Sequence, residues 1–247
     1  MTGEAGAAGK LPQAADRVAR QWSRDNFGAR MYDFIVMHKW LADPLGRIMW
    51  YNEMGDLYAD IARLGDVPAG SEILDIPCGG GVALRGLTPG RQVRYVAADI
   101  SPFMLDRARA EAARRGLAGI DFVHANVNEM PFEDATFDLC LTYNGLHCFP
   151  DPELAVAEMV RVLRPGGRIR GTAVVAGAGR VPAACIAIFK HADQFATVGK
   201  AEDIERWLAR AGIADPQVRQ RGAYAYFHGR RPGDVRVASR ADGGSDV

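Results

Sequence analysis

The sequence has few cysteines, and none of them is spaced for a metal or redox motif. They lie at Cys78, Cys140, Cys148 and Cys185. No two are separated by only two residues, which excludes a Cys-x-x-Cys motif, and the scattered positions do not indicate a disulfide framework. We therefore expect reduced thiols, no bound metal ion and a cytoplasmic location.

The sequence also lacks a long apolar run and an excess of charge of either sign. Its most apolar stretch, 171–189, is interrupted by glycines, Arg180 and Pro182, and residues 2–9 do not resemble a secretory leader. The 30 basic and 30 acidic residues cancel, and the arginines are not gathered in one stripe. We expect neither a membrane nor a nucleic acid as a partner.

The length and composition fit one α/β domain with an added segment. The chain has 247 residues, of which 48% are hydrophobic, and this is enough for a full core. Composition and periodicity divide it into four parts. We expect a disordered tail at 1–10, a helical arm or lid at 11–70, a core at 71–231 with a substrate-side insertion at about 176–198, and a flexible tail at 232–247.

Local patterns place the elements of the core. Acid-proline or serine-proline pairs at 43–44, 101–102 and 151–152 predict the beginnings of helices. Apolar and β-branched runs predict strands that follow the order of the chain. The expected strands cover 92–98, 120–125, 137–142 and 168–175, with two further β segments near 218 and at 224–228.

The stretch 71–81 predicts a buried strand that runs into a glycine-rich loop. Three consecutive glycines, Gly79 to Gly81, allow a ligand to approach the main chain closely. Asp75 stands just before this loop, and its carboxylate would repel the pyrophosphate of a dinucleotide. The pattern instead favours a ligand that is cationic near the glycines, such as S-adenosylmethionine with its ammonium and sulfonium groups.

The strand predicted at 92–98 ends in a second acid, Asp99. A carboxylate at this place can accept hydrogen bonds from two ribose hydroxyls, which both NAD and S-adenosylmethionine carry. The spacing Gly79-x-Gly81-x-x-Leu84 lacks the third small residue of the dinucleotide fingerprint. Together with Asp75, this spacing makes a nicotinamide oxidoreductase the less favoured alternative.

Residues 71–175 resemble the core of a class I S-adenosylmethionine-dependent methyltransferase that acts on small molecules. The matching pieces are Leu-Asp-Ile-Pro-Cys-Gly-Gly-Gly at 74–81, Ala-Asp-Ile-Ser-Pro-Phe-Met-Leu at 98–105, the Met-Pro-Phe segment within 126–132, Phe-Asp-Leu at 137–139 and Arg-Val-Leu-Arg-Pro-Gly-Gly at 161–167. The resemblance implies a Rossmann-like, seven-stranded, mostly parallel sheet with helices on both faces and an antiparallel last strand. Pro77 departs from the family pattern, which usually has glycine there.

The resemblance also implies which residues contact the cofactor. Asn126 replaces the usual aspartate, and its amide oxygen can still accept from the adenine amino group. Ile100 and Met104 are expected against the adenine ring. The loop after the strand at 137–142 is expected to face both cofactor and acceptor for a separate reason: in an open α/β sheet, ligands lie outside the carboxyl ends of the strands where the strand order reverses. The full predicted set is Asp75, Pro77, Cys78, Gly79, Gly81, Asp99, Ile100, Met104, Asn126, Val127, Tyr143 and Asn144.

The expected acceptor site has one candidate for a general base. His147 follows the strand at 137–142, and an imidazole can take a hydroxyl proton near neutral pH. A structural histidine bonded to a loop carbonyl is the competing interpretation. Aromatic residues of the arm and apolar residues of the insertion are expected to line the pocket. These candidates are Tyr32, Trp40, Ile186, Phe189, Lys190 and Phe195.

The predicted activity is methyl transfer from S-adenosylmethionine to a small, fairly apolar organic acceptor. The aromatic arm and apolar insertion favour O- or C-methylation of a specialised metabolite or a quinone-like compound. The Asn-Pro-Pro-Tyr pattern of base and amide methyltransferases is absent after the strand at 137–142. A protein of the same fold that binds the cofactor without methyl transfer, as a cyclase or a non-catalytic module, stays open, as does a homodimer.

Overall fold

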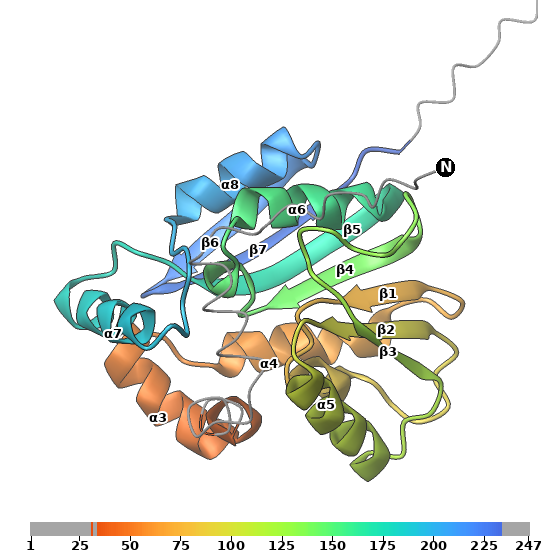
Figure 1. The fold of residues 1–247 in the computed structure, drawn as a ribbon, viewed down its shortest axis with the longest axis horizontal. Coiled ribbons are helices and arrows are strands. Elements are labelled where there is room, and N and C mark those ends of the chain that lie inside the picture. The colour runs from red at the N-terminus through yellow and green to blue at the C-terminus, as the bar shows by residue number, and fades with distance from the viewer. Residues whose placement is uncertain (1–30, 32–33, 234–247) are drawn as a thin grey trace, which may run out of the picture.

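The computed structural model describes residue 31 and residues 34–233, and it is built on one seven-stranded sheet (Figure 1). The strand order is β3-β2-β1-β4-β5-β7-β6. Strands β1 to β5 pair in parallel, whereas β7 is antiparallel to both β5 and β6. The strands are β1 (Glu72–Asp75), β2 (Arg94–Asp99), β3 (Ile120–His124), β4 (Phe137–Tyr143), β5 (Leu163–Val174), β6 (Ala214–Arg221) and β7 (Tyr224–Arg230). The predicted fold class is confirmed.

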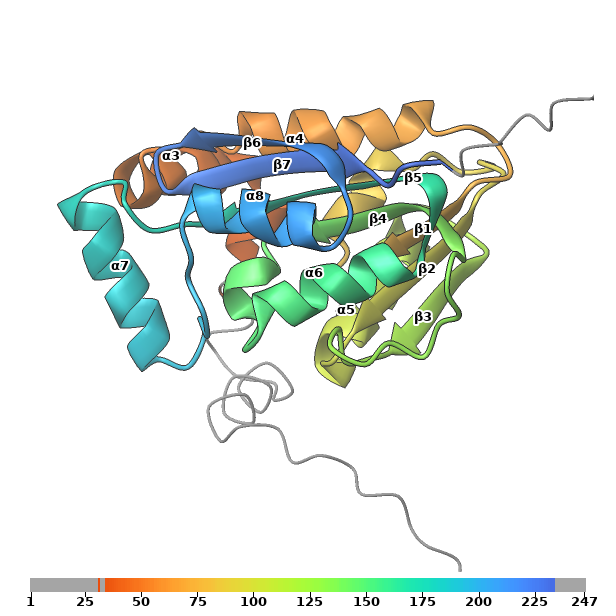
Figure 2. The same cartoon turned by 90° about the horizontal axis from the view of Figure 1, so that it is seen from above.

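Helices cover both faces of the sheet (Figure 2). The helices are α3 (Lys39–Trp50), α4 (Gly55–Ala62), α5 (Pro102–Arg114), α6 (Pro152–Arg161), α7 (Arg180–His191) and α8 (Ala201–Arg210), with short 3-10 turns at Arg63–Asp66, Val82–Gly86 and Leu146–Cys148. Alternate residues of each strand face opposite sides. Ile73 of β1 therefore packs in the core below α4 and α5, while Leu74 packs in the core below α6 and α8.

Two of the three predicted helix starts are confirmed by their caps. The Ser101 hydroxyl accepts from the Met104 N–H at 3.2 Å at the start of α5. The Asp151 carboxylate accepts from the Leu154 N–H at 3.0 Å at the start of α6. Each side chain satisfies an N–H that the first turn leaves unpaired, which fixes where the helix begins.

The third predicted start, at Asp43 and Pro44, is wrong. Helix α3 begins at Lys39 and carries Pro44 in its interior. Asp43 instead accepts a hydrogen bond from the N–H of Met54, the N-cap residue of α4, at 3.1 Å. The acid thus supports the helix that follows in the chain rather than its own.

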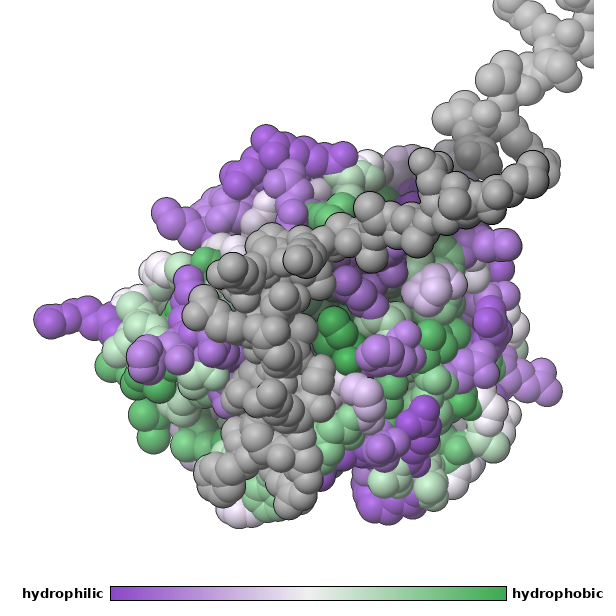
Figure 3. Space-filling view, in the orientation of Figure 1, coloured by the Kyte–Doolittle hydropathy of each residue, from purple (hydrophilic) through white to green (hydrophobic). Residues whose placement is uncertain are grey.

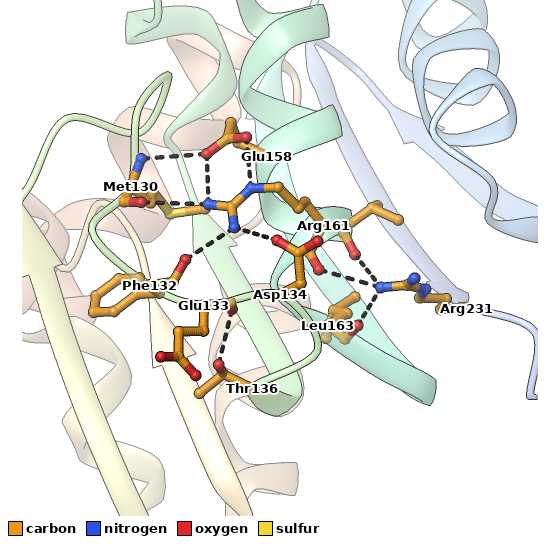
Figure 4. Close-up of polar contacts among 10 residues, drawn as sticks. Met130, Phe132, Glu133, Asp134, Thr136, Glu158, Arg161, Leu163 and Arg231 are labelled. Atoms are coloured by element: carbon orange, nitrogen blue, oxygen red, sulfur yellow. Dashed lines mark hydrogen bonds and ion pairs between the residues drawn. The ribbon is translucent and has the colours of Figure 1, made fainter.

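Arg161, the first residue of the motif at 161–167, holds neighbouring segments together through its guanidinium group (Figure 4). The Arg161 guanidinium donates to both oxygens of Glu158, at 2.8 and 2.9 Å, and to Asp134 at 2.7 Å. It also donates to the Phe132 carbonyl at 2.9 Å. Arg161 therefore ties α6 to the loop between β3 and β4. The strand after it begins at Leu163, five residues before the predicted 168, because Leu163 already pairs with Phe137.

The insertion expected at about 176–198 contains α7, which packs beside α3 at the left of Figure 1. The tail expected at 1–10, most of the tail at 232–247, and Tyr32 lie outside the described residues. All four cysteines are free thiols. In the part of the chain that the structure describes, no helix combines the length and hydrophobicity needed to cross a membrane.

Candidate functional site

Two acids stand at the carboxyl ends of neighbouring strands. Asp75 ends β1 and Asp99 ends β2, next to the place between β1 and β4 where the strand order reverses. The side chains of both, and of Tyr95, point to the α4–α5 face because they occupy alternate positions that share one side of the sheet. In an open α/β sheet this edge is where ligands bind.

Backbone N–H groups hold Asp99 in place. One carboxylate oxygen accepts from the Gly79 N–H at 2.9 Å and the other from the Ser101 N–H at 2.8 Å. Burial raises the pKa of Asp99 to about 6, and these two hydrogen bonds lower it. A carboxylate has about four acceptor positions, so each oxygen keeps capacity for a further donor. At pH 7 an ionised Asp99 can accept from two adjacent hydroxyls.

The glycine loop between Asp75 and Asp99 has one open and one packed position. Gly79 has φ of 52°, and a Cβ added there would meet nothing within 4 Å. Gly81 has φ of 88°, and a Cβ there would lie 2.9 Å from Leu84 and 3.2 Å from the Ala108 Cα. Gly81 thus allows the loop to pack on α5, while Gly79 leaves room for a ligand beside the main chain.

Asp75 is 1% exposed and accepts from the Tyr95 hydroxyl at 2.8 Å. Burial raises its pKa to about 7, the Tyr95 hydrogen bond lowers it, and the nearby Asp99 charge raises it. A cation placed at this edge would favour the ionised form of Asp75. Asp75 is therefore the group whose charge would favour the predicted cationic ligand, although its side chain is almost fully buried.

The other predicted cofactor contacts in the loops differ in how far they are buried. Met104 is buried at the start of α5, and Ile100 is half-buried beside it. Val127 is buried, and the Asn126 amide oxygen accepts from the Asn128 N–H at 3.1 Å, which shapes the loop after β3. This oxygen still has a lone pair for a second donor.

Pro77 and Cys78 form the bend between β1 and the glycines. The Cys78 N–H donates to the Ala98 carbonyl at 2.8 Å, and burial raises the pKa of the Cys78 thiol well above its ordinary value. Pro77 lies against Gly145, where an added Cβ would come within 2.5 Å of the Pro77 Cδ. These two residues shape the loop through their backbone rather than through a reactive group.

Tyr143 and Asn144 have partners away from the glycine loop. The Tyr143 hydroxyl donates to Asp60 of α4 at 2.6 Å. The Asn144 amide oxygen accepts from the Thr172 hydroxyl at 3.0 Å, and the Asn144 side chain is also hydrogen-bonded to Tyr224. Their side chains hold β4 to its neighbours, so a cofactor contact from this segment would involve its backbone.

The geometry of His147 opposes its predicted role as a general base. The ring is 2% exposed, and Nδ1 accepts from the Val174 N–H at 3.0 Å. A neutral imidazole that accepts at Nδ1 carries its hydrogen on Nε2, so neither nitrogen has a lone pair available. Burial lowers the pKa of His147 to about 3. At neutral pH, His147 is a hydrogen-bond donor.

His147 lines a cavity that lies between α3, α7 and the ends of β5 and β7. Of the predicted acceptor residues, Phe189 and Phe195 also line it. Trp40 does not, because its side chain is 70% exposed on α3. Ile186 is half-buried on α7 and lies outside the lining, and Lys190 is exposed.

Several residues at this edge were not predicted from the sequence. Tyr95, which holds Asp75, shares a strand face with Asp99 at a spacing of four, so strand alternation alone places both on one side. Trp50 and Tyr224 line the cavity from α3 and β7. Nothing in the local pattern around Trp50 or Tyr224 indicates that α3 and β7 meet.

Comparison with known proteins identifies a methyltransferase domain in the part of the chain that contains this edge. The family model "Methyltransferase domain" matches residues 74–170. The demethylmenaquinone methyltransferase of Bacillus cereus (strain B4264) is 37% identical over 110 residues, which are 43% of this chain and 46% of that protein. The chain thus matches less than half the length of this curated relative.

Solved structures with low sequence identity share the fold. The phosphoethanolamine N-methyltransferase 2 of Haemonchus contortus, solved with phosphomonomethylethanolamine and S-adenosylhomocysteine, has a TM-score of 0.70 at 17% identity and covers 90% of this chain and 61% of its own. The [4+2]-cyclase SpnF has a TM-score of 0.61 at 20% identity, and the match covers 83% of this chain and 95% of SpnF.

The order of the strands, the two acids at their carboxyl ends and the matched segment 74–170 agree with one another. They also agree with the resemblance that the sequence motifs indicate. Residues 74–170 match a methyltransferase domain, and the chain has the fold of the class I S-adenosylmethionine-dependent methyltransferases.

Proposed function

We propose that this chain binds S-adenosylmethionine at the carboxyl ends of β1 and β2 and transfers its methyl group to a small, fairly apolar organic acceptor. The observation that carries the proposal is Asp99, held by the Gly79 and Ser101 N–H groups with acceptor capacity left on both oxygens. The match of residues 74–170 to the methyltransferase domain supports it.

The residues at this edge fit the cofactor. Asp99 would accept from the ribose hydroxyls, and the space beside Gly79 would admit the chain that carries the sulfur. Asn126 would accept from the adenine amino group, with Ile100 and Met104 against the ring. When bound, S-adenosylmethionine supplies a methyl group already activated by the positive sulfur.

The chain's own contribution is alignment and exclusion of water. Holding two reactants in line can lower a barrier by about 7 to 11 kcal/mol. His147 cannot take a proton from the acceptor, because Nδ1 is occupied and Nε2 carries a hydrogen. The acceptor must therefore be nucleophilic enough without this histidine as a base, as a phenolate or an electron-rich aromatic carbon is.

The apolar cavity and one relative support the proposed class of acceptor. The demethylmenaquinone methyltransferase of Bacillus cereus is named for a quinone substrate, and a quinone-like or phenolic compound would suit a cavity with aromatic walls. O- or C-methylation is therefore the favoured reaction. A cytoplasmic location and a homodimer remain predictions.

A second candidate function is binding of the cofactor without methyl transfer. The cyclase SpnF shares the fold, and in this chain His147 is not arranged as a base. Incubation with S-adenosylmethionine that carries a labelled methyl group, together with a panel of phenols and hydroquinones, separates the two. Label in an organic product supports methyl transfer. Cofactor binding with no label transferred to any compound favours the second function.

A further inference from the structure

The cavity beside His147 has walls made of aromatic rings. Trp50 and Phe189 lie with ring centroids 5.7 Å apart, and Phe189 stacks on Phe195 at 4.9 Å with an interplanar angle of 17°. The ring of His147 meets that of Phe195 edge-on at 4.3 Å. Tyr224 of β7 completes this aromatic group. Such walls favour a flat apolar ligand.

Every polar side chain in the lining can donate a hydrogen bond, and none is an acid. The other lining residues are Ile35, Val36, Ala42, Leu45, Gly46, Met49, Met54 and Val174. Trp50 has only an N–H, Tyr224 has a hydroxyl, and His147 has its Nε2–H. An ammonium ligand, which can only donate, would find no carboxylate among these described lining residues.

The Nε2–H of His147 has no hydrogen-bond acceptor among the described residues. Nδ1 already accepts from the Val174 N–H, and His147 is only 2% exposed. His147 lines the cavity, so the oxygen of a ligand placed there can accept from this N–H.

We propose that this cavity is the acceptor subsite and takes a planar aromatic compound whose hydroxyl or carbonyl oxygen accepts from the His147 Nε2–H. The proposal rests on the proposed function and makes it more specific. His147 selects and positions the acceptor through this oxygen. The donors in the lining select an oxygen compound over an ammonium compound.

The cavity must widen to hold such a ligand. Its volume is about 70 Å³, whereas ligand sites usually have several hundred. Helix α7 is the wall best able to move, because Pro182 is its one buried residue while Val181 and Ile188 are 44% and 67% exposed. Hydrophobic surface is visible at the left of Figure 3, where α7 and α3 lie. We expect α7 to move outward on binding.

The first test compares three probes on the wild-type chain saturated with S-adenosylhomocysteine. Binding of 1-naphthol, naphthalene and 1-naphthylmethylammonium is followed by calorimetry, with quenching of tryptophan fluorescence as a second signal. We expect 1-naphthol to bind about fivefold to tenfold more tightly than naphthalene, as one added hydrogen bond gives. Equal affinities, tighter binding of the ammonium, or no binding of 1-naphthol at millimolar concentration would overturn the proposal.

The second test uses two variants that each keep one nitrogen's role. In His147→Asn the amide can still accept from the Val174 N–H but has no group at the place of Nε2. In His147→Gln the amide can place a donor near that position. We expect His147→Asn to bind 1-naphthol about fivefold to tenfold more weakly and naphthalene within twofold of wild type. His147→Gln should regain part of the loss.

A loss for both ligands alike in His147→Asn would make His147 a structural residue and overturn the proposal. If neither variant folds, as judged by S-adenosylhomocysteine binding, the three-probe series on the wild type decides alone. The same titrations separate this inference from the proposed function. A wild-type chain that does not bind S-adenosylhomocysteine contradicts the function, whereas one that binds it without preferring 1-naphthol contradicts only the acceptor subsite.

Discussion

Replacing Asp75 with asparagine should change how the stability of the protein depends on pH. The pKa of Asp75 is about 7 in the folded chain, against 3.8 for an unperturbed group, and burial is the main cause. The folded state therefore binds this proton more tightly than the unfolded state. The stabilisation that this gives is fully present below pH 3.8 and is lost as the pH rises to 7.

The size of the effect follows from the shift of the pKa. From 3.8 to about 7 is roughly 3 units, and each unit corresponds to about 1.4 kcal/mol, so the wild type should lose about 4 kcal/mol through this group. Asparagine has an oxygen that can accept from the Tyr95 hydroxyl, and it does not ionise. The variant should therefore escape this loss.

The assay is urea unfolding of wild type and Asp75→Asn at several pH values from 4 to 8. The difference in free energy of unfolding, variant minus wild type, should rise by about 4 kcal/mol over this range and level off as the pH approaches 8. Tyr95→Phe is the matched control, because it removes the bond that lowers the pKa and should move the loss to higher pH. A difference that does not change with pH would refute the reasoning.

Two further predictions concern the surroundings of the site. Gly81→Ala should destabilise the fold by about 1 to 3 kcal/mol more than Gly79→Ala in urea unfolding, because only at Gly81 does the new Cβ meet Leu84 and Ala108. Similar losses in both would contradict this. Tyr143→Phe should lower the free energy of unfolding by about 1.5 kcal/mol through the lost bond to Asp60, with S-adenosylhomocysteine affinity unchanged. Weaker ligand binding would place the Tyr143 side chain in the site.

Local sequence signals located the strands and the two acids but not the contacts between distant segments. Asp99 is predicted because a β-rich run ends in an acid, and in the structure its carboxylate accepts from the Gly79 N–H of the glycine loop. Ser101 and Asp151 were predicted as caps because capping depends on residues within one turn. Asp43 has the same local signal, yet its carboxylate accepts from the N–H of Met54, eleven residues away. Asp43 lies inside α3 rather than at its start.

The roles of the loop after β4 depend on tertiary contacts that spacing does not encode. His147 was predicted as a base from its place in the chain, but Val174 of β5 occupies its Nδ1. Trp40 and Trp50 are both on α3. Trp50 is buried because its ring packs against Phe189, Phe195 and Tyr224, whereas Trp40 is 70% exposed. Tyr224 reaches the cavity because β7 returns beside β5.

The central claim is that Asp99 holds the ribose of S-adenosylmethionine, and calorimetry tests it most directly. The wild type should bind S-adenosylmethionine, and Asp99→Ala should bind it more weakly by about 1.5 to 3 kcal/mol, as expected when hydrogen bonds to a charged group are lost. Asp106→Ala, whose side chain is 74% exposed on the following helix α5, should bind like the wild type. No heat with the wild type, or equal affinity in Asp99→Ala, would contradict the account.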